Sequence, residues 1–247
     1  MLLKNKTAVI TGCNRGIGKA TMEVFARNGA DIFACVRKET AEFSELASRL
    51  AEETRVAIKP VYFDLEDGEQ IKAGIKAIVS EKKRIDVLVN NAGVPSGSLF
   101  QMTSMQEMKR VFEINFFSQM LLSQGLSRLM ARHKTGAIVN VASTAGLIGD
   151  AGTTSYGASK AALMYATKTM AAELGELGIR VNAIAPSVTR TDMLAQMDAA
   201  ARDKLVNAAI LKRPAEAIEV ANVALFLASD LASYVTGQVL RVDGGHI

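Results

Sequence analysis

Short runs of apolar residues alternate along the chain with longer segments in which apolar residues recur at helical spacing. Several of the short runs are apolar at successive positions, as expected for strands that are covered on both faces. They predict strands at residues 7–12, 31–36, 56–64, 85–93, 137–143, 179–186 and 238–245. The amphipathic segments predict helices at residues 16–28, 40–54, 67–81, 104–132, 156–177 and 215–229.

The repeated strand–helix order predicts an α/β fold in which helices cover both faces of a doubly wound, mostly parallel sheet of seven strands. No repeat, low-complexity tract or linker interrupts the pattern, so we expect residues 1–247 to form a single domain. Residues 190–213 are rich in Ala and Met with scattered charges, and we expect them to form a lid over the substrate.

Two predicted helical stretches, 111–130 and 161–174, carry more apolar or small residues than contact with one sheet requires. A helix that is apolar around most of its circumference is normally buried. Contacts between subunits would bury this surface, and a covering loop is the alternative. The pattern favours a homo-oligomer.

Composition narrows the class of protein. Of the 247 residues 49% are hydrophobic, and the net charge of +4 is too small to indicate a nucleic-acid binder. Two Cys and two His argue against a disulfide framework and against a His/Cys metal site, which leaves carboxylate-bound Mg²⁺ open. No apolar run reaches the roughly 18 residues of a membrane span, and Lys4 and Lys6 interrupt the first apolar residues, unlike a signal peptide. We expect a cytoplasmic protein with neither a membrane nor a nucleic-acid partner, and we expect no metal.

A glycine-rich turn joins the first predicted strand to the first predicted helix. Gly12 permits a tight turn, Gly16 lets the backbone approach a pyrophosphate, and Gly18 lets the helix pack closely on the strand. The amides at the start of the helix would then face the phosphates. A glycine turn without a ligand is the alternative, but the strand–turn–helix context favours a Rossmann-type, dinucleotide-binding domain.

The end of the second predicted strand indicates which dinucleotide binds. An NAD enzyme carries an acid there to accept hydrogen bonds from the ribose 2′-hydroxyl, whereas this chain has Val36 followed by Arg37. A guanidinium forms charge-assisted bonds to a 2′-phosphate. Either Arg37 or Arg15 alone is consistent with an ordinary surface charge, but together they favour NADP(H).

Tyr156 and Lys160 lie at i and i+4, on one face of a predicted helix. Reduction of a carbonyl needs a proton donor at its oxygen, and a nearby ammonium lowers the pKa of a tyrosine from its usual value near 10. This spacing also arises by chance, so supporting residues decide. Ser143 ends a predicted strand, and its hydroxyl is placed to hold the substrate oxygen; Thr144 is the alternative.

The glycine turn, Asn90 to Gly93, Asn115, Ser143, Tyr156 and Lys160 together resemble the classical short-chain dehydrogenase/reductase family over almost the whole chain. The resemblance is strongest to bacterial 3-oxoacyl-[acyl-carrier-protein] reductases of fatty acid biosynthesis. It implies an NADP-dependent oxidoreductase and a homotetramer. The implied catalytic residues are Ser143, Tyr156, Lys160 and Asn115. The implied cofactor-binding residues are Gly12, Asn14, Arg15, Gly16, Ile17, Gly18, Arg37, Asp64, Leu65, Asn91, Ala92, Gly93, Tyr156, Lys160, Pro186, Thr189 and Thr191.

The resemblance gives Asn115 the role of a proton relay to Lys160 through water at a helix kink, and a satisfied core amide is the alternative. Asn90 is interpreted as structural. After Pro186 the family usually has Gly, whereas this chain has Ser187. Nicotinamide binding then requires that the backbone at Ser187 not need a positive φ.

The substrate remains open. A basic patch for an acidic acyl-carrier partner is available at Arg128, Arg132, His133 and Lys134, but Leu177 stands near a second position expected to be basic. One hypothesis is an NADPH-dependent reductase of a ketone of the 3-oxoacyl thioester type. Another is an NADP(H)- or NAD(H)-dependent dehydrogenase of a sugar, polyol or other secondary alcohol. A third, a cofactor-sensing protein without catalysis, is disfavoured because Tyr156 and Lys160 are both retained.

Overall fold

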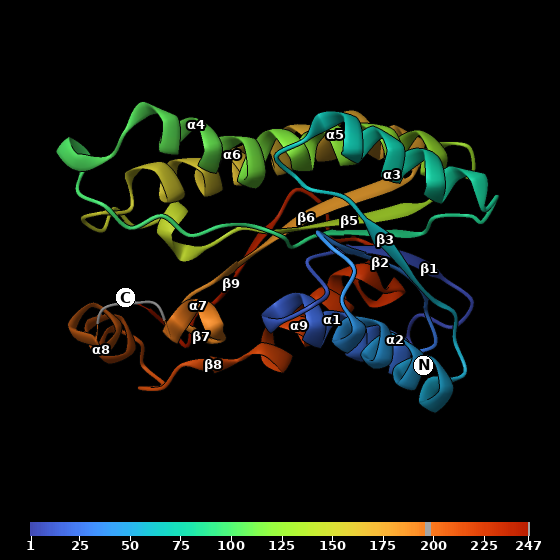
Figure 1. Ribbon diagram of the computed structural model, residues 1–247, viewed down its shortest axis with the longest axis horizontal. Helices are drawn as coiled ribbons and strands as arrows, with labels where there is room; N and C mark the ends of the chain where they lie inside the picture. The colour runs from blue at the N-terminus through green and yellow to red at the C-terminus, as the bar shows by residue number, and fades with distance from the viewer. Residues whose placement is uncertain (196–198, 247) are drawn as a thin grey trace.

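A parallel sheet lies between two layers of helices in the computed structural model, which describes residues 1–195 and 199–246 (Figure 1). Its seven strands follow the order β3-β2-β1-β4-β5-β6-β9. They are β1 (Thr7–Thr11), β2 (Asp31–Val36), β3 (Ile58–Tyr62), β4 (Val87–Asn90), β5 (Gly136–Val141), β6 (Ile179–Pro186) and β9 (Val239–Val242). The predicted fold is confirmed, and every predicted strand end lies within three residues of an observed one.

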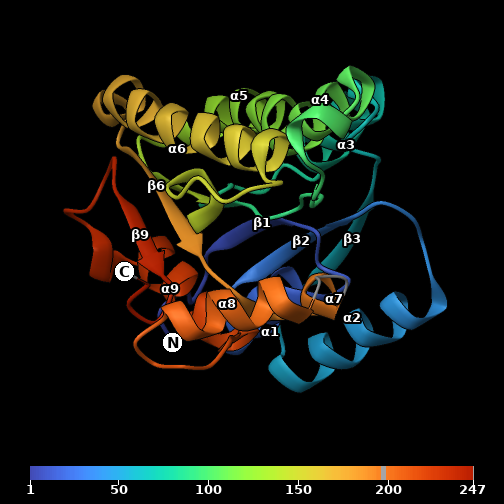
Figure 2. The same ribbon diagram turned by 90° about the vertical axis from the view of Figure 1, so that its left-hand side faces the viewer.

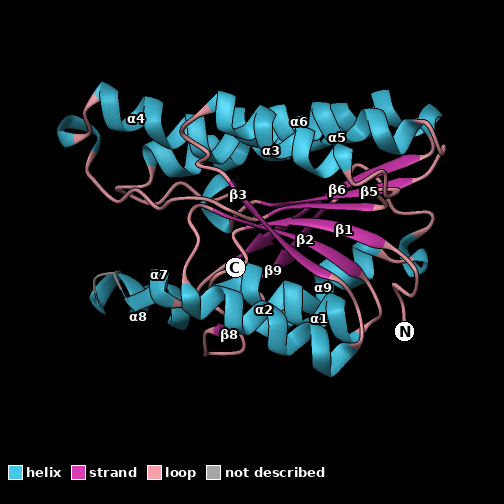
Figure 3. Cartoon of the chain, turned by 45° about the vertical axis from the view of Figure 1, so that its right-hand side comes forward, coloured by secondary structure: helices cyan, strands magenta, loops and turns pink. Residues whose placement is uncertain are grey.

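The helices divide between the two faces of the sheet (Figure 3). One layer contains α1 (Gly16–Arg27), α2 (Ala41–Thr54) and α9 (Ala217–Ala228). The other contains α3 (Gly68–Ser80), α4 (Met105–Phe112), α5 (Ser118–Ala131) and α6 (Thr154–Leu174). Successive strand residues point into opposite layers: Val9 packs in the cluster beneath α3 and α5, and Ile10 in the cluster beneath α1 and α9. Burial on both faces explains why the strands are apolar at successive positions.

The strand order changes direction at β1, which pairs with β2 on one side and with β4 on the other. The loop after β1 and the loop after β4 therefore leave the sheet toward opposite layers. A crevice opens between such loops at the carboxyl edge, where open α/β sheets bind their ligands. The glycine turn after β1 and the segment Asn91–Gly93 after β4 meet at this point.

The helix predicted at residues 104–132 is wrong as a single element. Between α4 and α5 the chain forms a π-helical segment, Glu113–Phe117. Such a segment inserts an extra residue into the helical repeat, and it turns the following side chains relative to those before it. Asn115 lies within it and is completely buried.

The expected lid begins and ends at a small second sheet. There β7 (Thr189–Arg190) pairs in parallel with β8 (Ala215–Glu216), and between them lie α7 (Asp192–Ala195) and α8 (Ala199–Ala208). Figure 2 shows α7 and α8 crossing in front of the carboxyl edge, opposite α4 and α6. Residues 196–198 of the expected lid lie outside the described residues.

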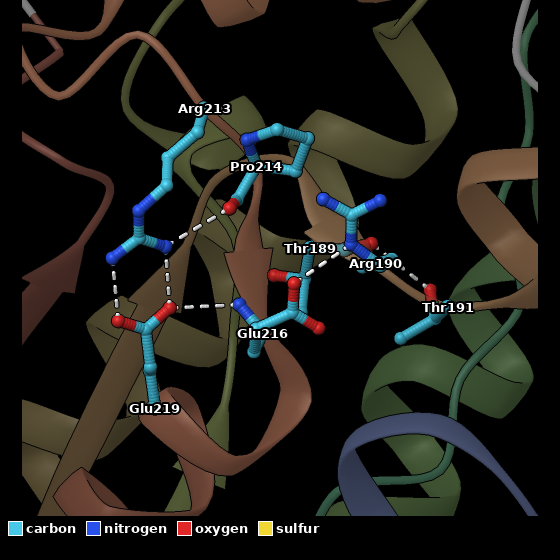
Figure 4. A network of polar contacts seen from close by, with 7 residues as sticks. All are labelled: Thr189, Arg190, Thr191, Arg213, Pro214, Glu216 and Glu219. Carbon is cyan, nitrogen blue, oxygen red and sulfur yellow. Dashed lines mark hydrogen bonds and ion pairs between the residues drawn. The ribbon is translucent and has the colours of Figure 1, made fainter.

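Two ion pairs close the base of this segment (Figure 4). The Arg213 guanidinium donates two hydrogen bonds, of 2.7 and 2.8 Å, to the Glu219 carboxylate, and Arg190 Nε lies 2.7 Å from Glu216 Oε1. Glu219 also accepts the Glu216 amide at 2.8 Å, at the start of α9. Arg213 holds the pKa of Glu219 down to about 2, so the pair is charged at neutral pH.

Short 3-10 turns complete the fold at Phe100–Met102, Thr144–Gly146, Gly175–Leu177 and Asp230–Ala232. Within the residues that the structure describes, no helix is both long and apolar enough to cross a membrane.

Candidate active site

The backbone of the turn after β1 requires glycine. Gly12 and Gly16 have φ of +76° and +56°, in the left-handed region that favours glycine. Gly18 has no room for a side chain, because a Cβ there would lie 2.1 Å from the Gly12 carbonyl oxygen. The turn therefore has the close helix–strand approach predicted from its spacing.

The start of α1 suits an anion. Arg15 occupies the N-cap position without a side-chain cap bond, and the first turn of the helix has no acidic residue. The amides of Gly12 and Cys13 both point at the Cys35 carbonyl, at 2.8 and 3.4 Å. The helix amides that follow are the ones available to phosphate oxygens, as a dinucleotide site needs. Asn14 is exposed and Ile17 half-buried beside them.

The two arginines predicted at a 2′-phosphate are both exposed. Val36 ends β2 as a buried residue, and Arg37 follows it on the surface. Arg15 lies 3.5 Å from Asp192 at the start of α7, and a Cβ on Gly16 would touch Thr191 at 3.2 Å. The lid segment thus begins directly against the glycine turn, a contact that the sequence did not reveal.

Thr11 holds the end of β4 against β1. Its hydroxyl accepts the amides of Asn91 and Ala92 at 3.0 and 2.9 Å, and its carbonyl accepts Asn91 Nδ2 at 2.9 Å. The Asn91 side-chain nitrogen therefore bonds to β1, and Ala92 lies against Gly12 of the glycine turn. Sequence reasoning missed Thr11; its only signal is a polar residue at the end of a buried strand.

Two further residues expected to bind the cofactor, Asp64 and Leu65, lie in the loop after β3. Asp64 is half-buried and its carboxylate accepts the Glu66 amide at 3.0 Å. Leu65 is buried, and its carbonyl accepts a hydrogen bond from the Ser118 hydroxyl. Asp64 thus shapes its own loop as an Asx turn does.

Tyr156 and Lys160 share one face of α6, as predicted. Lys160 is 4% exposed, and its Nζ donates to the Val141 carbonyl at 2.8 Å and lies 5.9 Å from the centre of the Tyr156 ring. A Cβ on Gly93 would come within 3.3 Å of Nζ, so glycine at this position leaves room for the ammonium.

Burial shifts both pKa values. It lowers the pKa of Lys160 to about 8. It also raises the pKa of Tyr156 above 10, and a hydrogen bond with Ser143 acts in the opposite direction. The expectation that the ammonium lowers the pKa of Tyr156 is wrong, because burial of the phenol has the largest effect and raises this pKa. Near neutral pH the pair is a phenol beside an ammonium.

Ser143, rather than Thr144, faces Tyr156. Ser143 follows β5 in extended backbone, and its hydroxyl accepts the Ala145 amide at 3.2 Å. Thr144 is buried and its hydroxyl donates to the Pro186 carbonyl at 3.4 Å, away from the phenol. The structure thus leaves Thr144 a packing role.

Asn115 fastens three segments together. Its side-chain amide accepts the Val94 amide at 2.9 Å and donates to the Val94 carbonyl at 3.0 Å and to Ser159 Oγ at 3.1 Å. Ser159 in turn donates to the Tyr156 carbonyl at 2.7 Å. Both ends of the Asn115 side chain are bonded to protein, so a relay through this residue would have to use its backbone.

The segment after β6 keeps ordinary backbone. Ser187 is not among the residues with positive φ, so the replacement of Gly by Ser introduces no strain there. Its amide donates to the Val242 carbonyl at 3.2 Å and its carbonyl accepts the Thr189 hydroxyl at 3.0 Å. Thr191 donates to the Thr189 carbonyl at 3.3 Å, which keeps it beside Gly16.

The loops around Ser143 and Tyr156 present apolar side chains to solvent. Ser98 donates to the Gly152 carbonyl at 3.1 Å, and Ser155 donates to Ser96 at 3.0 Å, which joins the loop before α4 to the loop before α6. These two loops and the start of α4 carry exposed Leu99, Phe100, Met102, Met105 and Leu147. We call these five residues the apolar rim.

A metal centre is not indicated in residues 1–195 and 199–246: no group of three or more His, Cys, Asp or Glu side chains there is arranged to hold an ion.

Residues 12–246 match the family model described as Enoyl-(Acyl carrier protein) reductase. The chain is 39% identical over 246 residues to the 3-oxoacyl-[acyl-carrier-protein] reductase FabG of Thermotoga maritima, covering 99% of each chain. The chain belongs to the short-chain dehydrogenase/reductase family. It is equally similar, at 39% identity, to a 3alpha-hydroxysteroid dehydrogenase of Mediterraneibacter gnavus, over 99% of this chain and 98% of the relative.

Among solved structures, this short-chain dehydrogenase/reductase resembles a protein from Beutenbergia cavernae named as an NAD(P) dependent gluconate 5-dehydrogenase and solved with NADP. The TM-score is 0.91 at 34% identity, covering 98% of this chain and 96% of the other. Family membership makes the chain an oxidoreductase that uses a nicotinamide cofactor. The relatives' names span acyl, steroid and sugar-acid substrates.

Proposed function

We propose that this short-chain dehydrogenase/reductase uses NADPH to reduce a ketone carried on an apolar body, of the 3-oxoacyl thioester type, with Tyr156 as the general acid. The observation that carries the proposal is the pair on α6: the ammonium of the buried Lys160 lies 5.9 Å from the ring of the half-buried Tyr156, with Ser143 at the phenol.

The residues present fit the cofactor. The open amides at the start of α1 suit its pyrophosphate, and Arg15 and Arg37 suit a 2′-phosphate where an NAD enzyme would carry an acid. The side of the crevice formed by Gly93, Pro186, Thr189 and Thr191 suits the nicotinamide, and Lys160 lies beside Gly93. When bound, the nicotinamide supplies the hydride for the carbonyl carbon.

The protein's own groups handle the proton and the charge. Ser143 holds the substrate oxygen by a hydrogen bond beside the phenol, and Tyr156 transfers its proton to that oxygen as the carbon is reduced. The product is the neutral alcohol, and the phenolate left on Tyr156 is stabilised by the Lys160 ammonium. Asn115 holds Val94 and the Ser159 turn of α6, so it orients the loop and the helix between which the substrate lies.

The surface of the site supports an apolar substrate. The apolar rim would contact the part of the molecule that projects beyond the ketone, whereas a sugar would gain little from these side chains. The basic residues Arg128, Arg132, His133 and Lys134 precede β5 at the amino edge of the sheet, opposite Ser143 at its carboxyl end. Within one chain these basic residues do not border the site. The apolar rim therefore supports an apolar substrate more directly than the basic residues support an acyl-carrier partner.

A second candidate function is oxidation of a secondary alcohol, such as a steroid or a sugar derivative. The names of two relatives support this second candidate, since one is a hydroxysteroid dehydrogenase and the other a gluconate dehydrogenase. In that direction the same phenolate would accept the proton of the alcohol, which is the reverse of the step above.

Initial rates with a substrate panel test the proposal. The panel holds an acetoacetyl thioester, a 3-ketosteroid, a small polar ketone and 5-ketogluconate, each with NADPH and with NADH, and the corresponding alcohols with the oxidised cofactors. We expect NADPH-dependent reduction of the acetoacetyl thioester to exceed that of 5-ketogluconate. Turnover confined to sugar derivatives would contradict the substrate class, and turnover confined to NADH would contradict the cofactor. A Tyr156→Phe variant with unchanged turnover would contradict the mechanism.

Association into oligomers is part of this proposal. Tyr165 on α6 and Phe117 before α5 are 71% and 53% exposed, on the outer surface of one helical layer. Such apolar exposure on neighbouring helices supports a homo-oligomer, which sedimentation measurements would detect.

A further inference from the structure

Polar side chains form a buried chain of hydrogen bonds behind the candidate site. Asn90 and Asn140 lie side by side, in register, on β4 and β5. Asn90 Nδ2 donates to Asn140 Oδ1 at 2.8 Å and to Ser123 Oγ of α5 at 2.9 Å. Asn140 Nδ2 donates to Thr167 Oγ1 at 2.9 Å, and the Thr167 hydroxyl donates to the Leu163 carbonyl at 2.8 Å.

Burying these polar side chains costs folding free energy, which indicates that they have a role here. Asn90, Ser123, Asn140 and Thr167 are each at most 2% exposed. They lie where the central strands of a parallel sheet and the helix packed on it normally carry apolar residues. Apolar contacts are non-directional, whereas a satisfied buried hydrogen bond favours one alignment of the elements that it joins.

The alignment of α6 on β5 matters for the site. Lys160 of α6 donates to the Val141 carbonyl of β5, and Tyr156 of α6 meets Ser143, which follows β5. Asn140 immediately precedes Val141. Thr167 lies seven residues beyond Lys160, two helical turns along the same face and about 10 Å away.

The bond from Asn140 to Thr167 therefore joins the same helix and the same strand as the contacts of Lys160 and Tyr156. The many small residues of α6 offer few protruding side chains to resist sliding along the sheet.

We propose that Thr167 is a positioning residue, whose hydrogen bond with Asn140 sets the position of α6 along β5 and thereby places Tyr156 opposite Ser143. This role rests on the proposed function of Tyr156 as the general acid. It requires no contact between Thr167 and either substrate or cofactor.

The variant Thr167→Val tests the role, because it keeps the shape of the side chain and removes the hydroxyl that Asn140 needs. We expect kcat for the ketone reduced by the wild type to fall by about tenfold, since misplacement by 1 Å can cost about a hundredfold. The Kd for NADPH, measured by fluorescence titration, is expected to stay unchanged. Thr167→Ser keeps the hydroxyl and is expected to restore kcat.

Thr21→Val is the matched control. Thr21 is also completely buried in a helix and donates to the carbonyl four residues earlier, Ile17, at 2.8 Å, but no side chain among the described residues donates to it. This variant is expected to lower the melting temperature as Thr167→Val does, and to leave kcat unchanged. If Thr167→Val does not fold, Thr167→Cys provides a side chain of similar volume with a weaker acceptor, and an intermediate kcat is expected.

Ultraviolet titration of the phenol reports on the same alignment without substrate. The Tyr156 signal is obtained by subtracting the titration of Tyr156→Phe from that of the wild type, and the titration of the double variant from that of Thr167→Val. We expect Thr167→Val to raise the pKa of Tyr156 relative to the wild type, because the hydrogen bond from Ser143 that lowers this pKa is weakened. Equal kcat and equal phenol titration, with a lowered melting temperature, would overturn the proposal. If the wild type reduced no ketone, the proposed function would fail, and the titration would still decide the role of Thr167.

Discussion

Lys160 combines a charged group with near-complete burial, and this determines much of the chemistry available at the residue scale. Burial lowers its pKa to about 8 and raises the pKa of Tyr156. Both shifts have one cause, because burial disfavours charge and so favours a neutral lysine and a neutral phenol. Below pH 8 the ammonium persists, so a proton on the phenol and a charge ready to stabilise the phenolate are both present.

Replacement of Lys160 by Met is expected to change how stability depends on pH. An unfolded lysine keeps its proton up to about pH 10.4, so between pH 8 and about 10 the unfolded wild type binds more protons than the folded one. The free energy of unfolding of the wild type therefore rises with pH across this window, by up to about 3 kcal/mol. In urea unfolding at pH 7 to 10, the free energy of unfolding of Lys160→Met minus that of the wild type should decrease as the pH rises. The variant should also lose reductase activity.

Lys168→Met is the control for this experiment, since Lys168 lies exposed on the same helix. Its difference from the wild type should be independent of pH in this window. A Lys160→Met difference that is equally constant would contradict the lowered pKa.

Arg37→Ala tests the cofactor preference. Loss of a hydrogen bond to a charged group costs about 1.5–3 kcal/mol, so the Kd for NADPH should rise about tenfold or more. The Kd for NADH, which has no 2′-phosphate, should stay the same. Fluorescence titration measures both. Lys38→Ala removes the neighbouring exposed charge, and an equal loss of NADPH affinity in this control would indicate a general effect of charge.

Sequence reasoning found the residues whose spacing is short and missed those whose partners are distant. Tyr156 and Lys160 are separated by one helical turn, so their shared face follows from the sequence. Thr11 and Asn91 are 80 residues apart in the chain, and Asn140 and Thr167 are 27 apart. A buried Thr or Asn does not reveal which distant residue it bonds to, because the strand order decides that.

At the scale of elements, hydrophobic periodicity predicted the long helices and strands but not the short ones. Strands β7 and β8 have two residues each, too few for a pattern. The π-helical segment is invisible for another reason: it inserts one residue into a continuous helical pattern, which still predicts a single helix. Asn115 is its only signal, as a polar residue in an apolar stretch.

Arg213→Ala is expected to loosen the segment between β7 and β8. Arg213, between α8 and β8, pairs with Glu219 in α9, and its loss removes one of the two ion pairs at the base of this segment. Limited proteolysis with thermolysin should cleave residues 199–211 faster than in the wild type, and the KM for the ketone should rise. The pair lies at the surface, where ion pairs contribute little to stability, so the global melting temperature should change little.

Arg202→Ala provides the comparison, because Arg202 lies in the same segment but pairs with its own neighbour Asp203. Unchanged cleavage in both variants would show that the ion pairs do not hold this segment.

At the scale of the whole molecule, the two edges of the sheet have different roles. The residues of the candidate site meet at the carboxyl edge. A cavity of about 380 Å³ opens instead at the amino edge, lined by Lys6, Asp86, Arg180 and Asp230 among others. There the Arg180 guanidinium donates to the carbonyls of Leu227 and Ser229, which satisfies the end of α9. This cavity is therefore separate from the candidate site.

Strand β9 has a consequence for the order in which the molecule assembles. It pairs with β6, and the turn after it receives the lid: the amides of Ile210 and Leu211 donate to the carbonyls of Gly245 and Gly244 at 3.4 and 3.0 Å. During synthesis on the ribosome these glycines emerge after every other part of the site. The nascent chain can therefore pair six strands while the expected lid is held only by the contacts at its base, and we expect the bonds to Gly244 and Gly245 to form last.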